Sequence, residues 1–113
     1  MIQHVVAFRF QGASLDQRRR NAERAAELLR PLAGSVPGLR ELVIENDRGA
    51  DPAHWDMVLI SHHDSLDALL VYMDHPLHST AKSAIDQIVE QRAIVDFEIL
   101  DPSGQTKGTN HVR

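Results

Sequence analysis

The chain has 113 residues, of which 42% are hydrophobic and 25% are charged, a composition typical of one globular domain. Its formal net charge of −4 provides no basic field for nucleic acid or anionic lipid, and no apolar run approaches the length of a membrane span. It has no cysteine, which excludes disulfides, thiolate nucleophiles and cysteine-based metal sites. We therefore expect no nucleic-acid or membrane partner and, because the N-terminus does not resemble a signal peptide, a cytoplasmic location.

The N-terminal third predicts a strand followed by a helix. Residues 2–10 are rich in Val and Phe and indicate a strand, and Ser14 with Gln17 three residues later is typical of a helix start. One face of that helix is apolar and consists of Leu15, Ala22, Ala25, Ala26, Leu29 and Leu32. Gly34 is suited to the C-terminal cap.

The middle of the chain predicts two strands and a second helix. Strands are expected over residues 39–45 and 55–61, separated by an exposed loop over residues 46–53 that contains Gly and Pro. Ser65 then caps a helix whose apolar face consists of Leu66, Leu69, Leu70 and Met73.

The C-terminal part predicts a third helical piece and a last strand. Pro76 is suited to the first position of a helix, and the apolar positions that follow, Ala81, Ala84, Ile85, Ile88 and Val89, have helical spacing. A fourth strand is expected over residues 92–100. Residues 101–113 lack periodicity and predict a flexible tail, so the domain is expected over residues 1–100.

This order predicts an α+β ferredoxin-like βαββαβ fold, with helices on one face of a four-stranded antiparallel sheet. Such a sheet should be apolar only on its helix side. The first strand instead has Val6, Phe8 and Phe10 on one face and Val5 and Ala7 on the other.

The fourth strand is likewise apolar on both faces, because Ile94 shares one face with Asp96 while Val95, Phe97 and Ile99 lie on the other. Helices can cover only one side of the sheet. We therefore predict a homodimer in which two open sheet faces pack together into a barrel-like core.

The segment from Tyr72 to His78 carries the strongest chemical signal. It places a phenol and the imidazoles of His75 and His78 around Pro76, which disfavours a continuous helix. Tyr and His are suited to moving protons or polarising a carbonyl near neutral pH.

With this motif the chain resembles the stress-responsive A/B barrel (Dabb) domain family of dimeric α+β barrels. The matching residues are His4 to Phe10, Pro37-Gly38, Trp55-Asp56, Ser65 to Leu69, Tyr72, His75-Pro76, His78 and Val95-Asp96-Phe97. The resemblance covers roughly residues 1 to 100 and implies the ferredoxin-like fold and the dimer.

The resemblance also implies a candidate site. A plant branch, similar to olivetolic acid cyclase, closes a linear polyketide, and its motif positions correspond to Tyr72, His78 and His4 here. His78 would be the general base, Tyr72 would donate a hydrogen bond to an enolate, and Asp96 would orient the imidazole of His78. The predicted catalytic residues are His78, Tyr72 and Asp96, and the predicted substrate-binding residues are His4, Val6, Phe8, Leu59, His75 and Ile94. No cofactor and no metal are implied.

The chain departs from the plant branch in the residues expected around the pocket. Bulky aromatics of that branch correspond to a region with Ala25, Ala26, Ala81 and Val89 here, and His63 replaces an aromatic at the end of the third strand. The pocket should therefore differ in shape from that of the plant enzyme.

Other interpretations of the histidines remain open at this level. The His-Pro-x-His motif could serve only to stabilise a helix junction. His75 and His78 could also bind a metal together with Asp74, His62 or His63, although the sequence does not define a third ligand.

Two functions therefore follow. The first is a stress-associated or ligand-binding homodimer whose pocket, around Tyr72, His78 and His4, holds a small apolar or phenolic carbonyl compound. The alternative is a cofactor-free, polyketide-cyclase-like lyase or isomerase that uses His78 as base.

Overall fold

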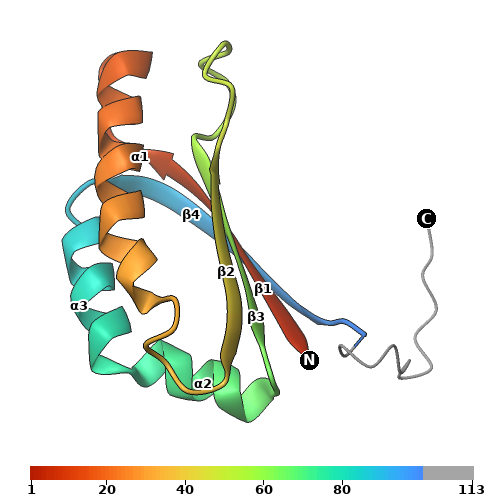
Figure 1. Cartoon of the computed structure of the whole chain (residues 1–113). Coiled ribbons are helices and arrows are strands. Elements are labelled where there is room, and N and C mark those ends of the chain that lie inside the picture. The colour runs from red at the N-terminus through yellow and green to blue at the C-terminus, as the bar shows by residue number, and fades with distance from the viewer. Residues whose placement is uncertain (101–113) are drawn as a thin grey trace.

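The computed structural model describes residues 1–100 and contains one four-stranded sheet with helices on one side (Figure 1). The strands are β1 (Ile2–Phe10), β2 (Leu39–Asn46), β3 (Met57–His63) and β4 (Val89–Glu98). The helices are α1 (Leu15–Leu29), the short 3-10 helix η1 (Arg30–Leu32), α2 (Leu66–Asp74) and α3 (Pro76–Ile85). All strand pairs are antiparallel in the order β2-β3-β1-β4, which confirms the ferredoxin-like α+β prediction. The tail predicted over residues 101–113 lies outside the described residues.

The predicted helix starts are confirmed in detail. The Ser14 hydroxyl accepts a hydrogen bond from the Gln17 N–H at 3.2 Å, and the Gln17 side chain accepts one from the Ala13 N–H at 2.6 Å. Ser65 caps α2 by accepting from the Ala68 N–H at 3.1 Å. These side chains satisfy backbone donors that have no partner within the first helical turn.

The first helix ends earlier than predicted. The α-helical pattern stops at Leu29, and residues 30–32 continue as a 3-10 turn that contains Pro31. Proline has no N–H for the α-helical ladder, which accounts for the change. Gly34, with a φ of 77°, therefore lies in the turn after η1 and does not cap α1 as predicted.

The third strand is displaced by two residues from its predicted position. It begins at Met57 and extends to His63, which pairs with Ile2, whereas the prediction began at Trp55 and ended at Ser61. Trp55 and Asp56 precede the strand, and the Asp56 carboxylate binds the Phe10 N–H and the Arg18 guanidinium.

The boundary between α3 and β4 also differs from the prediction. The helix ends at Ile85, and Val89 pairs with Phe10 at the start of β4. The spacing of Ile88 and Val89 is compatible with a continued helix. In the fold they follow the end of α3, and their partly buried side chains pack against the core. Ile88 also accepts a backbone hydrogen bond from Gln11 at 2.9 Å, which fixes this turn to the end of β1.

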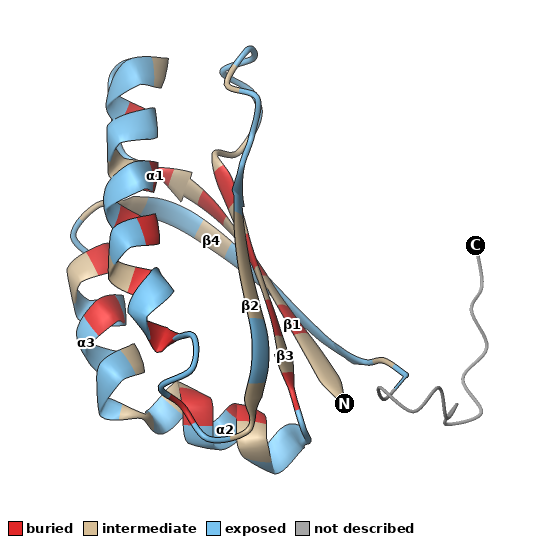
Figure 2. Ribbon diagram, viewed as in Figure 1, coloured by how far each residue is buried: buried red, intermediate tan, exposed pale blue. Residues whose placement is uncertain are grey.

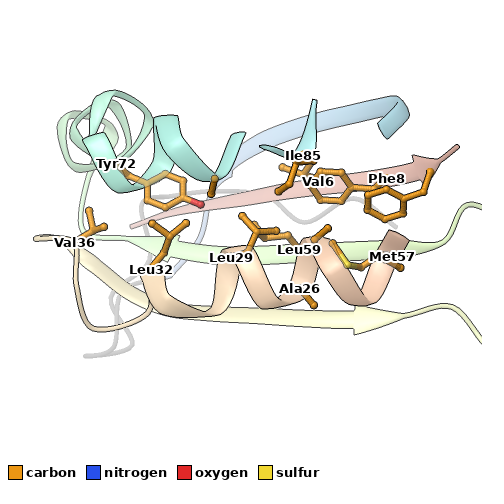
Figure 3. Close-up of a cluster of buried hydrophobic side chains, with 14 of the residues drawn as sticks. Val6, Phe8, Ala26, Leu29, Leu32, Val36, Met57, Leu59, Tyr72 and Ile85 are labelled. Carbon is orange, nitrogen blue, oxygen red and sulfur yellow. The ribbon is translucent and has the colours of Figure 1, made fainter. Parts of the chain in front are cut away.

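The core lies between the inward face of the sheet and the helices. Val6, Phe8 and Phe10 of β1 are at most 6% exposed, and they alternate with half-buried residues that point to the other face. In α1 the buried positions include Ala22, Ala25 and Ala26. These small side chains allow close packing of the helix on the sheet (Figure 3).

The second face of the sheet is uncovered. Both figures of the whole chain show the helices on one side only, with much of β4 exposed (Figure 2). Val95 is 59% and Phe97 is 43% exposed on this face, next to the half-buried Val5 and Ala7. The predicted two-faced apolar sheet is therefore confirmed. Among the described residues, no helix is long and apolar enough to cross a membrane.

A buried ion pair ties α1 to the loop before β3. The Arg18 guanidinium is 2.9 Å from the Asp56 carboxylate and donates to the carbonyls of Pro52 and His54 at 2.9 and 2.6 Å. Asp56 also accepts from the Phe10 N–H at 2.8 Å. Burial makes this pair essential as a unit, since either charge alone would lie uncompensated in the interior.

Replacement of Arg18 by Met should therefore lower the free energy of unfolding by about 3 kcal/mol or more, because Asp56 loses its counter-ion. Urea unfolding at pH 7 measures this change. As a control, Arg24→Met removes a cation whose side chain is 60% exposed and should change stability by no more than about 0.5 kcal/mol. Equal effects of the two substitutions would contradict the proposed importance of the buried pair.

Candidate functional site

A cavity of about 80 Å³ lies between the inward face of the sheet and the α2–α3 junction, at the edge formed by β4. It is lined by seven of the predicted site residues, namely His4, Val6, Phe8, Leu59, Tyr72, His78 and Ile94. Leu29, Met73, Lys82, Ile85 and Arg92 complete the lining. The predicted residues His75 and Asp96 are not part of it. Residues from three strands and three helices thus meet around one space.

Four aromatic rings form a contiguous cluster at one end of the cavity. The Tyr72 ring centre is 4.7 Å from that of His78, 4.8 Å from that of His63 and 6.2 Å from that of His4. Tyr72 therefore lies at the centre of three imidazoles, and Figure 3 shows it at one end of the buried apolar cluster, with Phe8 towards the other.

Tyr72 is 1% exposed, and this burial raises the pKa of its phenol to about 12. A buried phenolate would lose its hydration, so the neutral form is favoured. The hydroxyl therefore remains protonated over the physiological range and can donate a hydrogen bond to a developing negative charge.

His78 lies in the first turn of α3 and is half-buried. Burial is the largest cause that lowers the pKa of His78, and the charges of His4, Lys82 and Arg92 lower it further, while the Met73 backbone carbonyl raises it. Its Nδ1 atom is buried without a hydrogen-bond partner. The imidazole is therefore neutral at neutral pH and able to accept a proton.

Asp96 binds His4, which differs from the predicted role of orienting His78. The Asp96 carboxylate is 2.5 Å from Nδ1 of His4, and the two residues are direct partners across β1 and β4. His4 is 3% exposed, so this contact satisfies an otherwise buried polar atom and fixes the orientation of the imidazole.

Ser61 and His63 are functional candidates that were not among the predicted site residues. Both are fully buried, and the Ser61 hydroxyl lies 2.8 Å from Nε2 of His63. Burial lowers the pKa of His63 to about 4, and the neighbouring His4 lowers it as well. The period-2 alternation of β3, which places Ser61 and His63 on the same face as Leu59, was the signal that could have identified them.

His75 stabilises the helix junction. Its Nδ1 atom accepts from the Leu77 N–H at 3.1 Å, and Pro76 occupies the first position of α3. The sequence motif thus separates into two roles, since His75 caps a helix while His78 reaches the cavity.

The outer end of the cavity is cationic. Lys82 and Arg92 both line it, and both contact Asp86 beyond the end of α3, with 3.1 Å between Lys82 Nζ and the Asp86 carboxylate. The hydrogen bond from Lys82 is the largest cause that lowers the pKa of Asp86. Within residues 1–100, no group of three or more His, Asp or Glu side chains is arranged to hold a metal ion.

The model of the stress responsive A/B barrel domain (Dabb) family matches residues 2–99. No curated protein matches the chain. The similar solved structures include a dimeric protein of unknown function with a ferredoxin-like fold from Bacteroides fragilis. It is 24% identical, with a TM-score of 0.74, over 87% of this chain and 95% of that chain.

A dimeric ferredoxin-like protein of unknown function from Thermobifida fusca has the same identity and TM-score, over 87% of this chain and 90% of that chain. A hydroxynitrile lyase from Passiflora edulis is 16% identical with a TM-score of 0.71, over 87% of this chain and 92% of that chain. These likenesses support the fold.

The buried imidazole of His63 predicts a loss of stability in acid. Because its folded-state pKa of about 4 lies below the ordinary value of 6.5, the unfolded chain binds the proton more readily. Between pH 6.5 and pH 4 this difference should lower the free energy of unfolding progressively, by up to about 3 kcal/mol.

The substitution His63→Phe removes this titration and keeps an aromatic ring of similar size. Urea unfolding at several pH values should show the variant losing less stability than the wild type as the pH falls from 6.5 to 4. Parallel pH profiles for the two proteins would contradict a neutral, buried His63.

Proposed function

The chain belongs to the stress responsive A/B barrel domain (Dabb) family, and on that basis we propose that it catalyses cofactor-free proton transfer on a small carbonyl compound. The observation that carries this proposal is the meeting of Tyr72, His78 and His4 at one cavity. A neutral phenol and a neutral imidazole with adjacent rings supply a hydrogen-bond donor and a proton acceptor in one place.

In the proposed reaction His78 removes a proton from the carbon next to the substrate carbonyl. The electron pair of that C–H bond forms the enolate, and Tyr72 donates a hydrogen bond to its oxygen. The enolate carbon then takes back a proton at a different position, which is isomerisation, or bonds to a second carbonyl carbon, which is an aldol-type closure. In the closure the proton held by His78 passes to the new alkoxide, so no oxidant or reductant is consumed. Reversal of the closure is a lyase reaction.

The apolar walls favour this chemistry. Val6, Leu59 and Ile85 line the cavity as buried apolar side chains, which limits the access of water to the groups they surround. In such an environment a hydrogen bond from Tyr72 to a developing charge is stronger than in water. The contact between Asp96 and His4 supports a second role, in which His4 keeps one orientation and positions the carbonyl.

One protein of this fold is a hydroxynitrile lyase, so the fold hosts a lyase in at least one case. Its low identity to this chain gives no information on the substrate here.

We also propose that the protein is a homodimer that packs through its open sheet face. Structural neighbours described as dimeric support a dimer, and the exposed Val95 and Phe97 supply the argument for this face. Association would bury this surface and leave the helix side, with the cavity, accessible.

A second candidate function is binding of a small apolar or phenolic carbonyl compound without turnover, in a stress-associated role. The mostly apolar lining, which includes Val6, Leu59 and Ile85, favours a ligand of this kind. Binding and catalysis differ in one observable, which is whether a C–H proton of the ligand is exchanged.

Deuterium incorporation into 5-oxohexanamide, followed by NMR in D₂O, tests the catalytic proposal. We expect the protein to accelerate exchange at the carbons next to the ketone. The His78→Ala substitution should reduce the acceleration by about 10² to 10⁴-fold, because the proton acceptor is lost. Tyr72→Phe should reduce it by about 10²-fold, because the enolate loses its donor.

His54→Gln is the matched control, since it removes an exposed histidine from the loop before β3 and should leave the exchange rate unchanged. Binding of the ketone without any acceleration of exchange would favour the non-catalytic function. Equal acceleration by wild type and His78→Ala would contradict the role of His78 as base.

The dimer proposal predicts that Val95→Lys weakens association by about a hundredfold or more, because a charge would be buried at the interface. Sedimentation at micromolar concentration measures the oligomeric state. Leu66→Lys changes a residue that is 58% exposed on the helix side and should remain dimeric. A wild type that sediments as a monomer would contradict the proposal.

A further inference from the structure

The outer part of the cavity has a charge pattern that proton transfer at Tyr72 and His78 does not use. Along α3, His78, Lys82 and Asp86 follow one another at intervals of four residues, so they lie in one row along the helix. His78 and Lys82 both line the cavity. Lys82 therefore lies one helical turn, about 6 Å along the axis, from the proposed base.

The second cation comes from the strand opposite this row. Arg92 pairs with Phe8 across β4 and β1, so its side chain belongs to the inward face of the sheet. Its guanidinium carbon lies 6.0 Å from the centre of the Phe8 ring, which is a cation–π contact. Phe8 and Arg92 are both lining residues, so this cation is held in the cavity wall.

The cation pair is only partly neutralised. Lys82 and Arg92 share a single carboxylate, that of Asp86, and the three side chains together carry a formal charge of +1. The Asp86 carboxylate binds both cations, and the carboxylate of a ligand could bind them in the same way. A single negative charge on the ligand would bring the group to neutrality, which favours a monoanion such as a carboxylate over a phosphate dianion.

We propose that Lys82 and Arg92 form a subsite for the carboxylate of a keto acid whose carbonyl lies at Tyr72 and His78. This inference rests on the proposed function and narrows its substrate class from carbonyl compounds to oxo acids. Ile94, which lies between Arg92 and Asp96 along β4 and is 50% exposed, would contact the apolar chain that joins the two groups.

The spacing of the residues determines the length of that chain. The axial distance of about 6 Å between His78 and Lys82 corresponds to a carbonyl and a carboxylate separated by about three methylene groups. The carbonyl end would fill the small inner cavity, and the carboxylate would remain at its partly exposed mouth. The charges of Lys82 and Arg92 also contribute to lowering the pKa of His78, in keeping with their position on the same cavity.

Binding of 5-oxohexanoate and 5-oxohexanamide, measured by isothermal titration calorimetry, tests this subsite. The two compounds have nearly the same shape and differ in one negative charge. For the wild type we expect the acid to bind about tenfold or more tightly than the amide, because its carboxylate makes charge-assisted hydrogen bonds. The advantage should decrease at high salt, since the mouth is partly exposed.

Three substitutions locate the effect. In the double variant Lys82→Gln/Arg92→Gln, acid and amide should bind within about twofold of each other, because the cations that distinguish the two compounds are removed. Asp86→Asn should increase the preference for the acid, because it removes the competing carboxylate. Arg24→Gln is the matched control, since it removes an exposed cation that does not line the cavity and should leave the preference unchanged.

The outcomes separate this inference from the proposed function. Equal binding of acid and amide by the wild type, with deuterium exchange still dependent on His78, would overturn the carboxylate subsite and leave the catalytic proposal intact. A preference for the acid that survives in the double variant would also overturn the subsite. Binding of neither compound by the wild type would contradict both proposals.

Discussion

The alternation of side chains along β1 is the constraint on which the rest of the structure depends. This strand lies between β3 and β4, so each of its residues contributes to one of two faces. On the inward face His4 continues the row of Val6, Phe8 and Phe10, and the same register that builds the core therefore places an imidazole inside it. A shift of one residue in this register would expose the core and move His4 to the open face.

Burial of polar groups at one end of this core has a cost that specific contacts offset. His4 is bound by Asp96, and His63 is bound by Ser61, which are contacts between residues on neighbouring positions of the sheet. Two imidazole nitrogens, Nδ1 of His63 and Nδ1 of His78, remain buried without partners. Unsatisfied polar atoms are uncommon in stable cores, and both of these belong to rings that pack against Tyr72. Such atoms lower the stability of the fold, and they are expected at functional sites.

The helix break at Pro76 links the fold to the candidate site. Because His75 caps α3, the chain can turn between α2 and α3 without leaving the first N–H groups of α3 unsatisfied. The turn brings Tyr72, at the end of α2, beside His78, at the start of α3, with 4.7 Å between ring centres. The same helix then directs Lys82 towards the mouth of the cavity, so one element joins the neutral, buried end to the charged, exposed end.

The sequence by itself determined the order of elements, the two apolar faces of the sheet, and the positions of Ser14, Ser65 and Pro76 at helix starts, because these depend on local periodicity and capping. It also identified most residues of the cavity, including Tyr72, His78 and His4, largely through resemblance to a family. Only the tertiary structure decided that Asp96 binds His4, that His63 packs against Tyr72, and that Lys82 and Arg92 meet at the mouth. These contacts join residues from different strands and helices, and strand register and helix packing bring such residues together in ways that local patterns do not encode.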